Sequence, residues 1–203
     1  MARIFIVIGK SATGKDTVYK GLLEAKDLCL NKVVMYTTRP IRKGETEGVE
    51  YHFTNEEYLL RLKEENKVIE HRSYNTIHGT WHYFTVNDGQ VDIDKSDYLM
   101  IGTLQVYSQI KKYFGSDKVI PIYIEVEDGV RLLRAITRER EQEQPRYIEA
   151  CRRFIADAED FSEEKLKQNE ILKRYDNTDL EACLIHIKTD IKNITINNLD
   201  TML

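Results

Sequence analysis

A glycine-bounded turn at residues 9–15, with the sequence GKSATGK, is the first feature that could do chemistry. Backbone N–H groups in such a turn converge on a phosphate, and the following helix and the ammonium of Lys15 add positive charge. The turn follows a run of apolar residues (4–8) and precedes a segment with helical spacing, which is the context that this chemistry needs. The spacing therefore predicts a nucleoside triphosphate site at Gly9, Ser11, Ala12, Thr13, Gly14, Lys15, Asp16 and Thr17.

The residue after Lys15 is Asp16, where turns of this kind have Ser or Thr, and Thr17 follows. Mg²⁺ prefers hard oxygen ligands, so Asp16 and Thr17 are candidate ligands for an ion that accompanies the triphosphate. A carboxylate in the first turn of a helix is also favourable on electrostatic grounds alone, so a purely structural role for Asp16 remains open.

A second cluster lies at residues 37–53, with the sequence TTRPIRKGETEGVEYHF. Two arginines, Arg39 and Arg42, could offer forked donors to one phosphate, although a solvated basic loop would look the same. The segment fills every fixed position of TTRxxRxGExxGxxYxF, a signature of the guanylate kinase family. Together with the turn at residues 9–15, it makes the chain resemble a divergent member of that family over about residues 3–192.

The resemblance implies an ATP-dependent nucleoside monophosphate kinase that converts ATP and GMP to ADP and GDP. Arg39, Arg42 and Tyr51 would hold the GMP phosphate, and Glu45 would orient the arginines. A carboxylate at Glu70 would accept hydrogen bonds from guanine N1–H and N2–H, which adenine lacks. The implied GMP-binding set is Arg39, Arg42, Glu45, Tyr51, Glu70, His78 and Thr80, and Asn177 would lie near the donor base.

Arginines in the segments 131–138 and 153–154 are similar to those of the family's lid. Arg134 and Arg138 share a helix face, and positive charge brought over a transferring phosphoryl group stabilises the transition state. Surface ion pairs with Glu139 or Glu141 are the simpler alternative. The candidate catalytic residues are Lys15, Arg39, Arg134, Arg138 and Arg153.

Three positions depart from the family pattern. His78 stands where a tyrosine usually contacts the acceptor phosphate, and Ile101 and Thr103 replace two acids. Asp16 would compensate for the lost charge on the metal side. The sequence thus leaves three candidate acceptors: GMP, another (deoxy)nucleoside monophosphate and a different small molecule. A catalytically inactive guanylate kinase-like binding module is the alternative of another class, but such modules typically lose the glycine and lysine that stand here as Gly14 and Lys15.

The order of the segments predicts an α/β fold with a P-loop NTPase-type parallel sheet and helices on both faces. One kinase domain would comprise a core (1–36, 91–127 and 160–203), an inserted mixed α+β subdomain for the monophosphate (37–90) and a helical lid (128–159). Expected strands are 3–8, 32–36, 51–53, 67–74, 80–86, 98–101 and 119–126. Expected helices are 15–26, 54–65, 104–114, 128–142, 146–160, 162–174 and 179–192.

Composition excludes several classes of protein. The 203 residues include 30 Lys and Arg against 34 Asp and Glu, which is the wrong balance for a generic partner of nucleic acid or anionic membranes. No apolar run approaches the length of a membrane span, and the three dispersed cysteines indicate a reducing, cytoplasmic location. His78 and His82 lack a third ligand at metal spacing, so no zinc site is expected.

Overall fold

A parallel sheet forms the core of the protein in a computed structural model that describes residues 2–76 and 79–199, with the backbone alone for 196–199. The sheet has five strands in the order β2-β7-β1-β8-β9, and every neighbouring pair is parallel. The strands are β1 (Ile4–Ile8), β2 (Asn31–Lys32), β7 (Tyr98–Ile101), β8 (Val119–Glu125) and β9 (Arg174–Asp176). The predicted α/β fold is confirmed.

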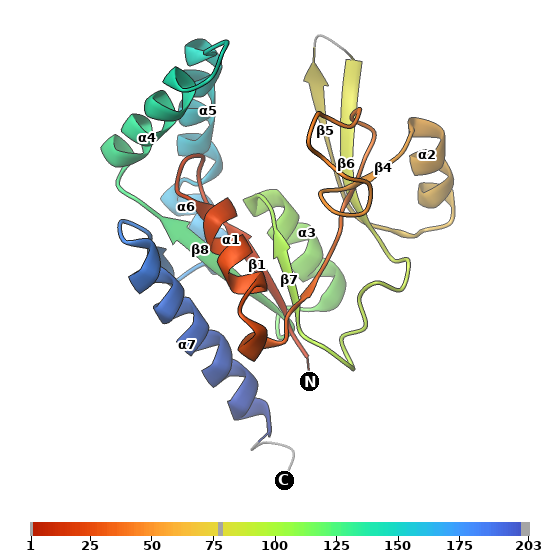
Figure 1. The fold of residues 1–203 in the computed structure, drawn as a ribbon. Helices are drawn as coiled ribbons and strands as arrows, with labels where there is room; N and C mark the ends of the chain where they lie inside the picture. Colours follow the sequence, from red (N-terminus) through yellow and green to blue (C-terminus); the bar gives the residue numbers. More distant parts are fainter. Residues whose placement is uncertain (1, 77–78, 200–203) are drawn as a thin grey trace.

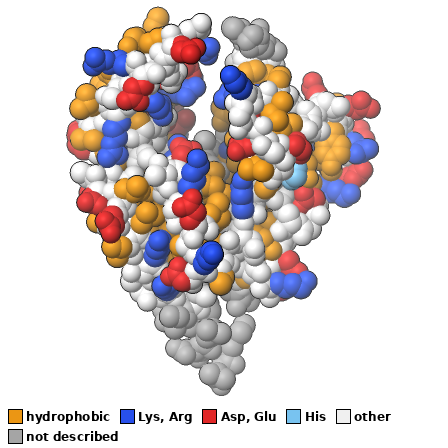
Figure 2. Space-filling view, viewed as in Figure 1, with side chains coloured by type: hydrophobic (Ala, Val, Ile, Leu, Met, Phe, Trp, Pro, Cys, Tyr) orange, Lys and Arg blue, Asp and Glu red, His pale blue; other side chains and the backbone are white. Residues whose placement is uncertain are grey.

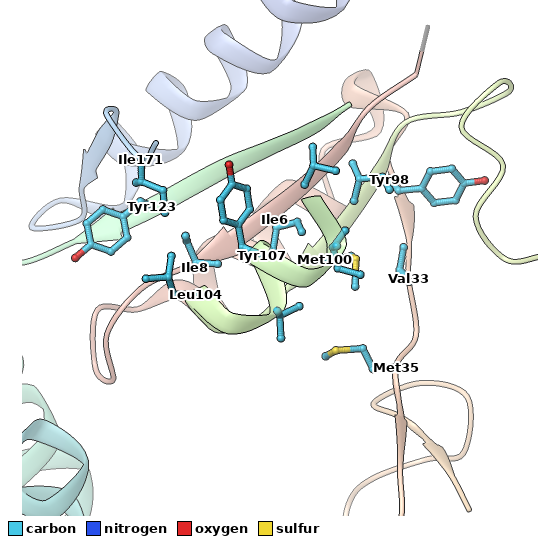
Figure 3. Packing of buried hydrophobic residues seen from close by; sticks show 14 of the residues in the cluster. Ile6, Ile8, Val33, Met35, Tyr98, Met100, Leu104, Tyr107, Tyr123 and Ile171 are labelled. Carbon is cyan, nitrogen blue, oxygen red and sulfur yellow. The ribbon is translucent and has the colours of Figure 1, made fainter. Parts of the chain in front are cut away.

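Helices cover both faces of this sheet (Figure 1). All five residues of β1 are fully buried, and alternation sends their side chains to opposite faces. Ile4, Ile6 and Ile8 pack with α3 (Leu104–Phe114) and α6 (Glu163–Gln168), as Figure 3 shows for part of this cluster. Phe5 and Val7 pack with α1 (Lys15–Leu23) and α7 (Leu180–Leu199). A short 3₁₀ helix, η1 (Lys26–Leu28), follows α1.

A second, mixed sheet has the strand order β4-β3-β6-β5. Its strands are β3 (Tyr36–Thr37), β4 (His52–Phe53), β5 (Val68–Thr76) and β6 (Gly79–Val86). The helix α2 (Glu56–Glu64) packs through Leu59 and Leu62 against Phe84 and Val86 of β6. Successive side chains of a strand point to opposite faces of the sheet. The face of the β5–β6 hairpin that α2 does not cover is therefore available for a site.

The helices α4 (Asp128–Arg140) and α5 (Tyr147–Asp160) stand beside each other at the upper left of Figure 1. The hairpin β5–β6 and α2 stand at the upper right, and the space-filling view shows the cleft between these two parts (Figure 2). The glycine-bounded turn between β1 and α1 lies at the base of the α4–α5 side (Figure 1). No helix in the described part of the chain is long and apolar enough to cross a membrane.

Two of the expected elements were wrong. The helix expected at 162–174 ends at Gln168, because Glu170 adopts a left-handed conformation (φ 59°). The N–H of Ile171 then donates to the Leu166 carbonyl and that of Glu170 to Lys167, a C-terminal arrangement that frees the chain to form β9. The strand expected at 32–36 is split between β2 in the first sheet and β3 in the second.

Candidate functional site

The glycine-bounded turn follows β1 directly and ends where α1 begins. Gly14 caps α1 in the left-handed region (φ 80°), and a Cβ there would lie 2.5 Å from Nδ2 of Asn177. A Cβ on Gly9 would lie 2.6 Å from the backbone oxygen of Ile124. Both glycines are therefore required by close approach of neighbouring groups, which explains the spacing of the motif.

Asn177 fixes the turn from the β9–α7 connection. It is 4% exposed, and its Nδ2 donates to the Thr13 carbonyl at 2.7 Å. Thr13, itself buried, donates through Oγ1 to the Lys10 carbonyl at 2.9 Å. The turn is thus held by side chains before any ligand binds, which lowers the cost of ordering it around a phosphate.

A cavity of about 540 Å³ opens in front of the turn. It brings together residues from the turn, α1, both helices of the α4–α5 pair and the start of α7. Its lining is Ser11, Ala12, Gly14, Lys15, Asp16, Thr17, Arg134, Arg138, Arg153, Asn177, Thr178 and Leu180. Four of these side chains are cations and one is an acid, so the cavity suits a polyanion.

The arginines of this cavity are held in different ways. Arg134 donates from Nη2 to the Asn177 carbonyl at 3.1 Å, and Arg153 donates from Nε to Oε1 of Glu149 at 2.8 Å. Hydrogen bonds from Arg152 and then Arg153 lower the pKa of Glu149 to about 2, so it stays ionised. Glu139, which the sequence allowed as an ion-pair partner of Arg134 and Arg138, instead accepts from the backbone N–H of Arg146 at 2.9 Å.

Candidate metal ligands also line the cavity. Asp16 is largely exposed, and its Oδ2 lies 3.6 Å from Nζ of Lys15. Among the described residues, no three His, Cys, Asp or Glu side chains gather as a metal cage. Mg²⁺ commonly binds through one or two protein oxygens plus substrate phosphates, and the oxygens of Asp16 and Thr17 fit that arrangement.

Arg39 is the centre of the second cluster. It is 3% exposed, and its Nη1 and Nη2 donate to the two oxygens of Glu45 at 2.9 and 2.8 Å. Its guanidinium lies 5.5 Å from the ring centroids of both Tyr51 and Phe53. The Arg39 hydrogen bonds hold the pKa of Glu45 below its usual range. Oε2 of Glu45 also accepts from the backbone N–H of Arg42 at 2.8 Å. The structure thus brings Arg39, Glu45 and Tyr51 together and joins Arg42 to them through its backbone.

Glu70 is 1% exposed and lies on the face of the β5–β6 hairpin opposite Phe84 and Val86. Its Oε1 accepts from Oγ1 of Thr85 at 3.1 Å and lies 3.9 Å from Nη2 of Arg72. Its Oε2 has no hydrogen-bond partner among the described residues. Burial raises the pKa of Glu70, although Arg72 and Thr85 oppose this shift. The buried carboxylate of Glu70 therefore lacks part of its hydrogen bonding, which a donor on a bound ligand would supply.

Thr80 lies apart from Glu70. In the hairpin register, Thr80 pairs with Asn75 and Glu70 with Thr85, so the two are five residues apart along the sheet. That corresponds to about 16 Å, and an odd separation puts them on opposite faces. Thr80 donates from Oγ1 to Oδ1 of Asn75 at 3.0 Å. His78, the remaining candidate, lies outside the described residues.

Several residues of the site were missed from the sequence. Arg72 is 8% exposed, lies 5.7 Å over the Tyr83 ring and donates to Sδ of Met35 at 3.4 Å. The period of two along β5 could have indicated it, since residues two apart share a face. Thr178 and Leu180 also line the cavity; they stand in the segment 177–180, which resembles a family segment near the donor base, but only Asn177 was chosen from it. Thr103, at a family acid position, instead caps α3 by accepting from the Val106 N–H at 3.4 Å.

Comparison with known proteins points to one family. A family model described as guanylate kinase matches residues 1–192. The chain is 30% identical to a guanylate kinase of Helicobacter hepaticus over 113 residues, covering 55% of this chain and 54% of that protein. It is 32% identical to those of Porphyromonas gingivalis (61% and 65% covered) and Chlorobaculum tepidum (66% and 68% covered). The aligned regions thus span about half to two thirds of these relatives.

A solved structure shares the fold. The crystal structure of guanylate kinase from Anaplasma phagocytophilum superposes with a TM-score of 0.62 at 23% sequence identity. The superposition covers 95% of this chain and 85% of that one.

Proposed function

The chain belongs to the guanylate kinase family, and from this premise we propose that it transfers the γ-phosphoryl group of ATP to GMP. The observation that carries the proposal is the cavity that joins the GKSATGK turn to three arginines. The buried Arg39–Glu45 pair across the cleft supports it from the acceptor side. The products would be ADP and GDP.

On the donor side, the backbone N–H groups of the GKSATGK turn, apart from that of Ser11, which donates to Asp157, would bind the phosphates. Lys15 would reach the outer phosphates. Arg134, Arg138 and Arg153 would neutralise the charge that develops on the transferring group. In this proposal residues 128–159 act as a lid on a core made of 1–36, 91–127 and 160–203. Closure of the lid excludes water, which would otherwise accept the phosphoryl group and waste ATP.

A magnesium ion would accompany ATP, held by Asp16 and Thr17 together with phosphate oxygens. The ion supplies charge neutralisation at the transferring phosphate when it is bound. The residues of the chain itself align the donor and the acceptor, and no covalent intermediate or dedicated base is needed.

On the acceptor side, residues 37–90 would bind the monophosphate. The guanidinium groups of Arg39 and Arg42, with the hydroxyl of Tyr51, would hold its phosphate, and Glu45 would keep Arg39 in place. Glu70, whose Oε2 lacks a described partner, would accept from guanine N1–H and N2–H. His78 remains a candidate for a further acceptor contact, whereas Thr80 lies on the face opposite Glu70.

The test is a coupled assay of ADP formation with GMP, dGMP, AMP, UMP and CMP as acceptors. GMP should give the highest kcat/KM, and Lys15→Ala should abolish turnover with every acceptor. Absence of turnover with GMP in the wild-type chain would end the proposal.

Another acceptor is the second candidate. Two observations favour it: Thr80 lies on the face opposite Glu70, and Arg72 already lies 3.9 Å from that carboxylate. A higher kcat/KM for a different monophosphate in the same panel would select this alternative. A binding module without catalysis would show heat of binding for a nucleotide but no ADP formation, and the intact Gly14 and Lys15 argue against it.

A further inference from the structure

We propose that Asp157 and Arg131 are positioning residues for the triphosphate site, an inference that rests on the proposed function. Together they clasp Ser11, the third residue of the phosphate-binding turn. The clasp sets the shape of the turn and the direction in which α4 and α5 present their arginines.

Both backbone groups of Ser11 are held by side chains from these two helices. The Ser11 N–H donates to Oδ2 of Asp157, on α5, at 2.7 Å. The Ser11 carbonyl accepts from Nη1 of Arg131, on α4, at 2.8 Å. Nη1 of Arg131 also lies 3.3 Å from the same Asp157 oxygen, which closes a ring of three residues.

Arg131 is buried, and its charge is balanced within the cluster. It is 1% exposed, and its guanidinium carbon lies 4.7 Å from the centroid of the Phe154 ring. Its Nε donates to Oδ1 of Asp128 at 3.0 Å, and Nζ of Lys10 lies 3.3 Å from that oxygen. A buried guanidinium without such partners would be costly, so its position is tightly determined. The charge of Arg131 also keeps the Asp157 carboxylate from repelling a neighbouring triphosphate.

The turn needs support at this point because its backbone is strained. Ala12, next to Ser11, has a φ of 62°, a conformation that is unfavourable for a residue with a Cβ. Such residues persist only where surrounding contacts determine them. Asn177 holds the carbonyl of Thr13 on one side of Ala12, and the clasp holds Ser11 on the other.

The clasp also fixes the rotation of the two helices about their axes. Arg131, Arg134 and Arg138 follow one another at spacings of three and four residues on α4, so they share a face. Arg153 and Asp157 are four apart and share a face of α5. Anchoring Arg131 and Asp157 to the turn therefore directs Arg134, Arg138 and Arg153 toward the cavity that they line.

The experiment compares Asp157→Ala, Asp157→Asn and Asp157→Glu with a matched control, Asp160→Asn, on the same helix. Asp160 is exposed, and its Oδ1 lies 3.8 Å from Nζ of Lys165. Calorimetry measures the affinity for a non-hydrolysable ATP analogue, steady-state kinetics give kcat and both KM values, and NMR follows exchange of the Ser11 amide.

We expect Asp157→Ala to weaken binding of the analogue by about 10-fold or more, as for loss of a charge-assisted hydrogen bond. Its kcat falls and the Ser11 amide exchanges faster, while the KM for GMP stays within about twofold because the acceptor side is untouched. Asp157→Asn keeps an oxygen acceptor for Ser11 and recovers most of the affinity. Asp157→Glu keeps the charge but displaces it by one methylene, so it falls in between, and Asp160→Asn matches the wild type throughout.

An Asp157→Ala variant that binds the analogue as tightly as the wild type, or more tightly, would overturn the proposal. Tighter binding would mean that the carboxylate competes with phosphate for the Ser11 N–H. If Asp157→Ala does not fold, the same comparison is made with Asp157→Glu. Wild-type affinity for the analogue and wild-type exchange of the Ser11 amide in that variant would overturn the proposal. A wild-type chain that phosphorylates no monophosphate, yet binds the analogue through Asp157, would refute the proposed function and leave the clasp intact.

Discussion

Substitution of Glu45 by glutamine should loosen the guanidinium cluster that we propose to hold the acceptor phosphate. In the native protein the two carboxylate oxygens of Glu45 accept hydrogen bonds from Nη1 and Nη2 of Arg39 at 2.9 and 2.8 Å. Glutamine keeps one oxygen acceptor, so the N–H of Arg42 can still be satisfied. The negative charge opposite the buried Arg39 is lost.

The size of the effect follows from burial. Leaving one partner of a fully buried ion pair uncompensated costs about 3–5 kcal/mol. Here Glu45 is 17% exposed, and Arg39 keeps its hydrogen bond to the Pro40 carbonyl at 2.8 Å and its two aromatic neighbours. We therefore expect the free energy of unfolding to fall by about 2 kcal/mol at pH 7. For a chain of this length that corresponds to a decrease in Tm of about 4–8 °C.

The loss should depend on pH in a defined direction. Hydrogen bonds from Arg39 hold the pKa of Glu45 below its usual value. The stabilisation is therefore fully present above pH of about 4.5, the usual range of the carboxyl, and disappears as pH falls through the lowered native pKa. Wild type and Glu45→Gln should converge in acid. Urea unfolding followed by circular dichroism between pH 3 and 8 measures this difference.

A matched control is Glu57→Gln, an exposed acid on α2, which should stay within about 0.5 kcal/mol of the wild type. The KM for GMP should rise about 10-fold in Glu45→Gln, because Arg39 loses its orientation. The reasoning would be refuted if Glu45→Gln matched Glu57→Gln at pH 7, or if its deficit persisted unchanged at pH 3.

Three further outcomes are expected. Gly14→Ala should weaken binding of an ATP analogue at least about 10-fold by calorimetry, since its Cβ would lie 2.5 Å from Nδ2 of Asn177 at a φ of +80°; wild-type affinity would contradict this. Burial lowers the pKa of His71 to about 4, so the unfolded chain binds more protons between pH 4 and 6.5, and unfolding free energy should rise with pH across that window. His71→Gln should flatten that rise in urea titrations, and an unchanged slope would exclude His71 as its source. Asp16→Ala should abolish Mg²⁺-dependent turnover but retain ADP binding; full activity would show that Asp16 is not needed for the metal.

The glycine-bounded turn could be predicted from the sequence because its residues are local. Residues 9–15 form one turn between a strand that is buried on both faces and a helix, so spacing alone specifies their geometry. The helix at 104–114 was predicted with the same bounds, since Thr103 caps its start and Gly115 follows its end. In such segments the sequence pattern marks the same residues at which the backbone begins and ends the turn or helix.

Elements that depend on distant partners could not be predicted in this way. The strand β9 has three residues, Arg174 to Asp176, which is too short a segment for alternation of polar and apolar residues to indicate a strand. It becomes a strand because it pairs with β8 and because Tyr175 is buried on the sheet face that α1 and α7 cover. The clasp on Ser11 is similar, because Asp157 lies 146 positions away along the chain.

The acceptor side shows why a motif that identifies residues does not determine their geometry. Glu70 and Thr80 both match the family pattern, yet a regular hairpin with Glu70 opposite Thr85 puts Thr80 on the other face. Arg72 does share a face with Glu70 and adds a cation in a buried position. In the proposed function, a guanine at this site would supply donors to Oε2 of Glu70 in the presence of that guanidinium, which already offsets part of the charge. Discrimination between guanine and other bases would then depend on how Arg72 and the base share one carboxylate, a balance that is absent from the family motif.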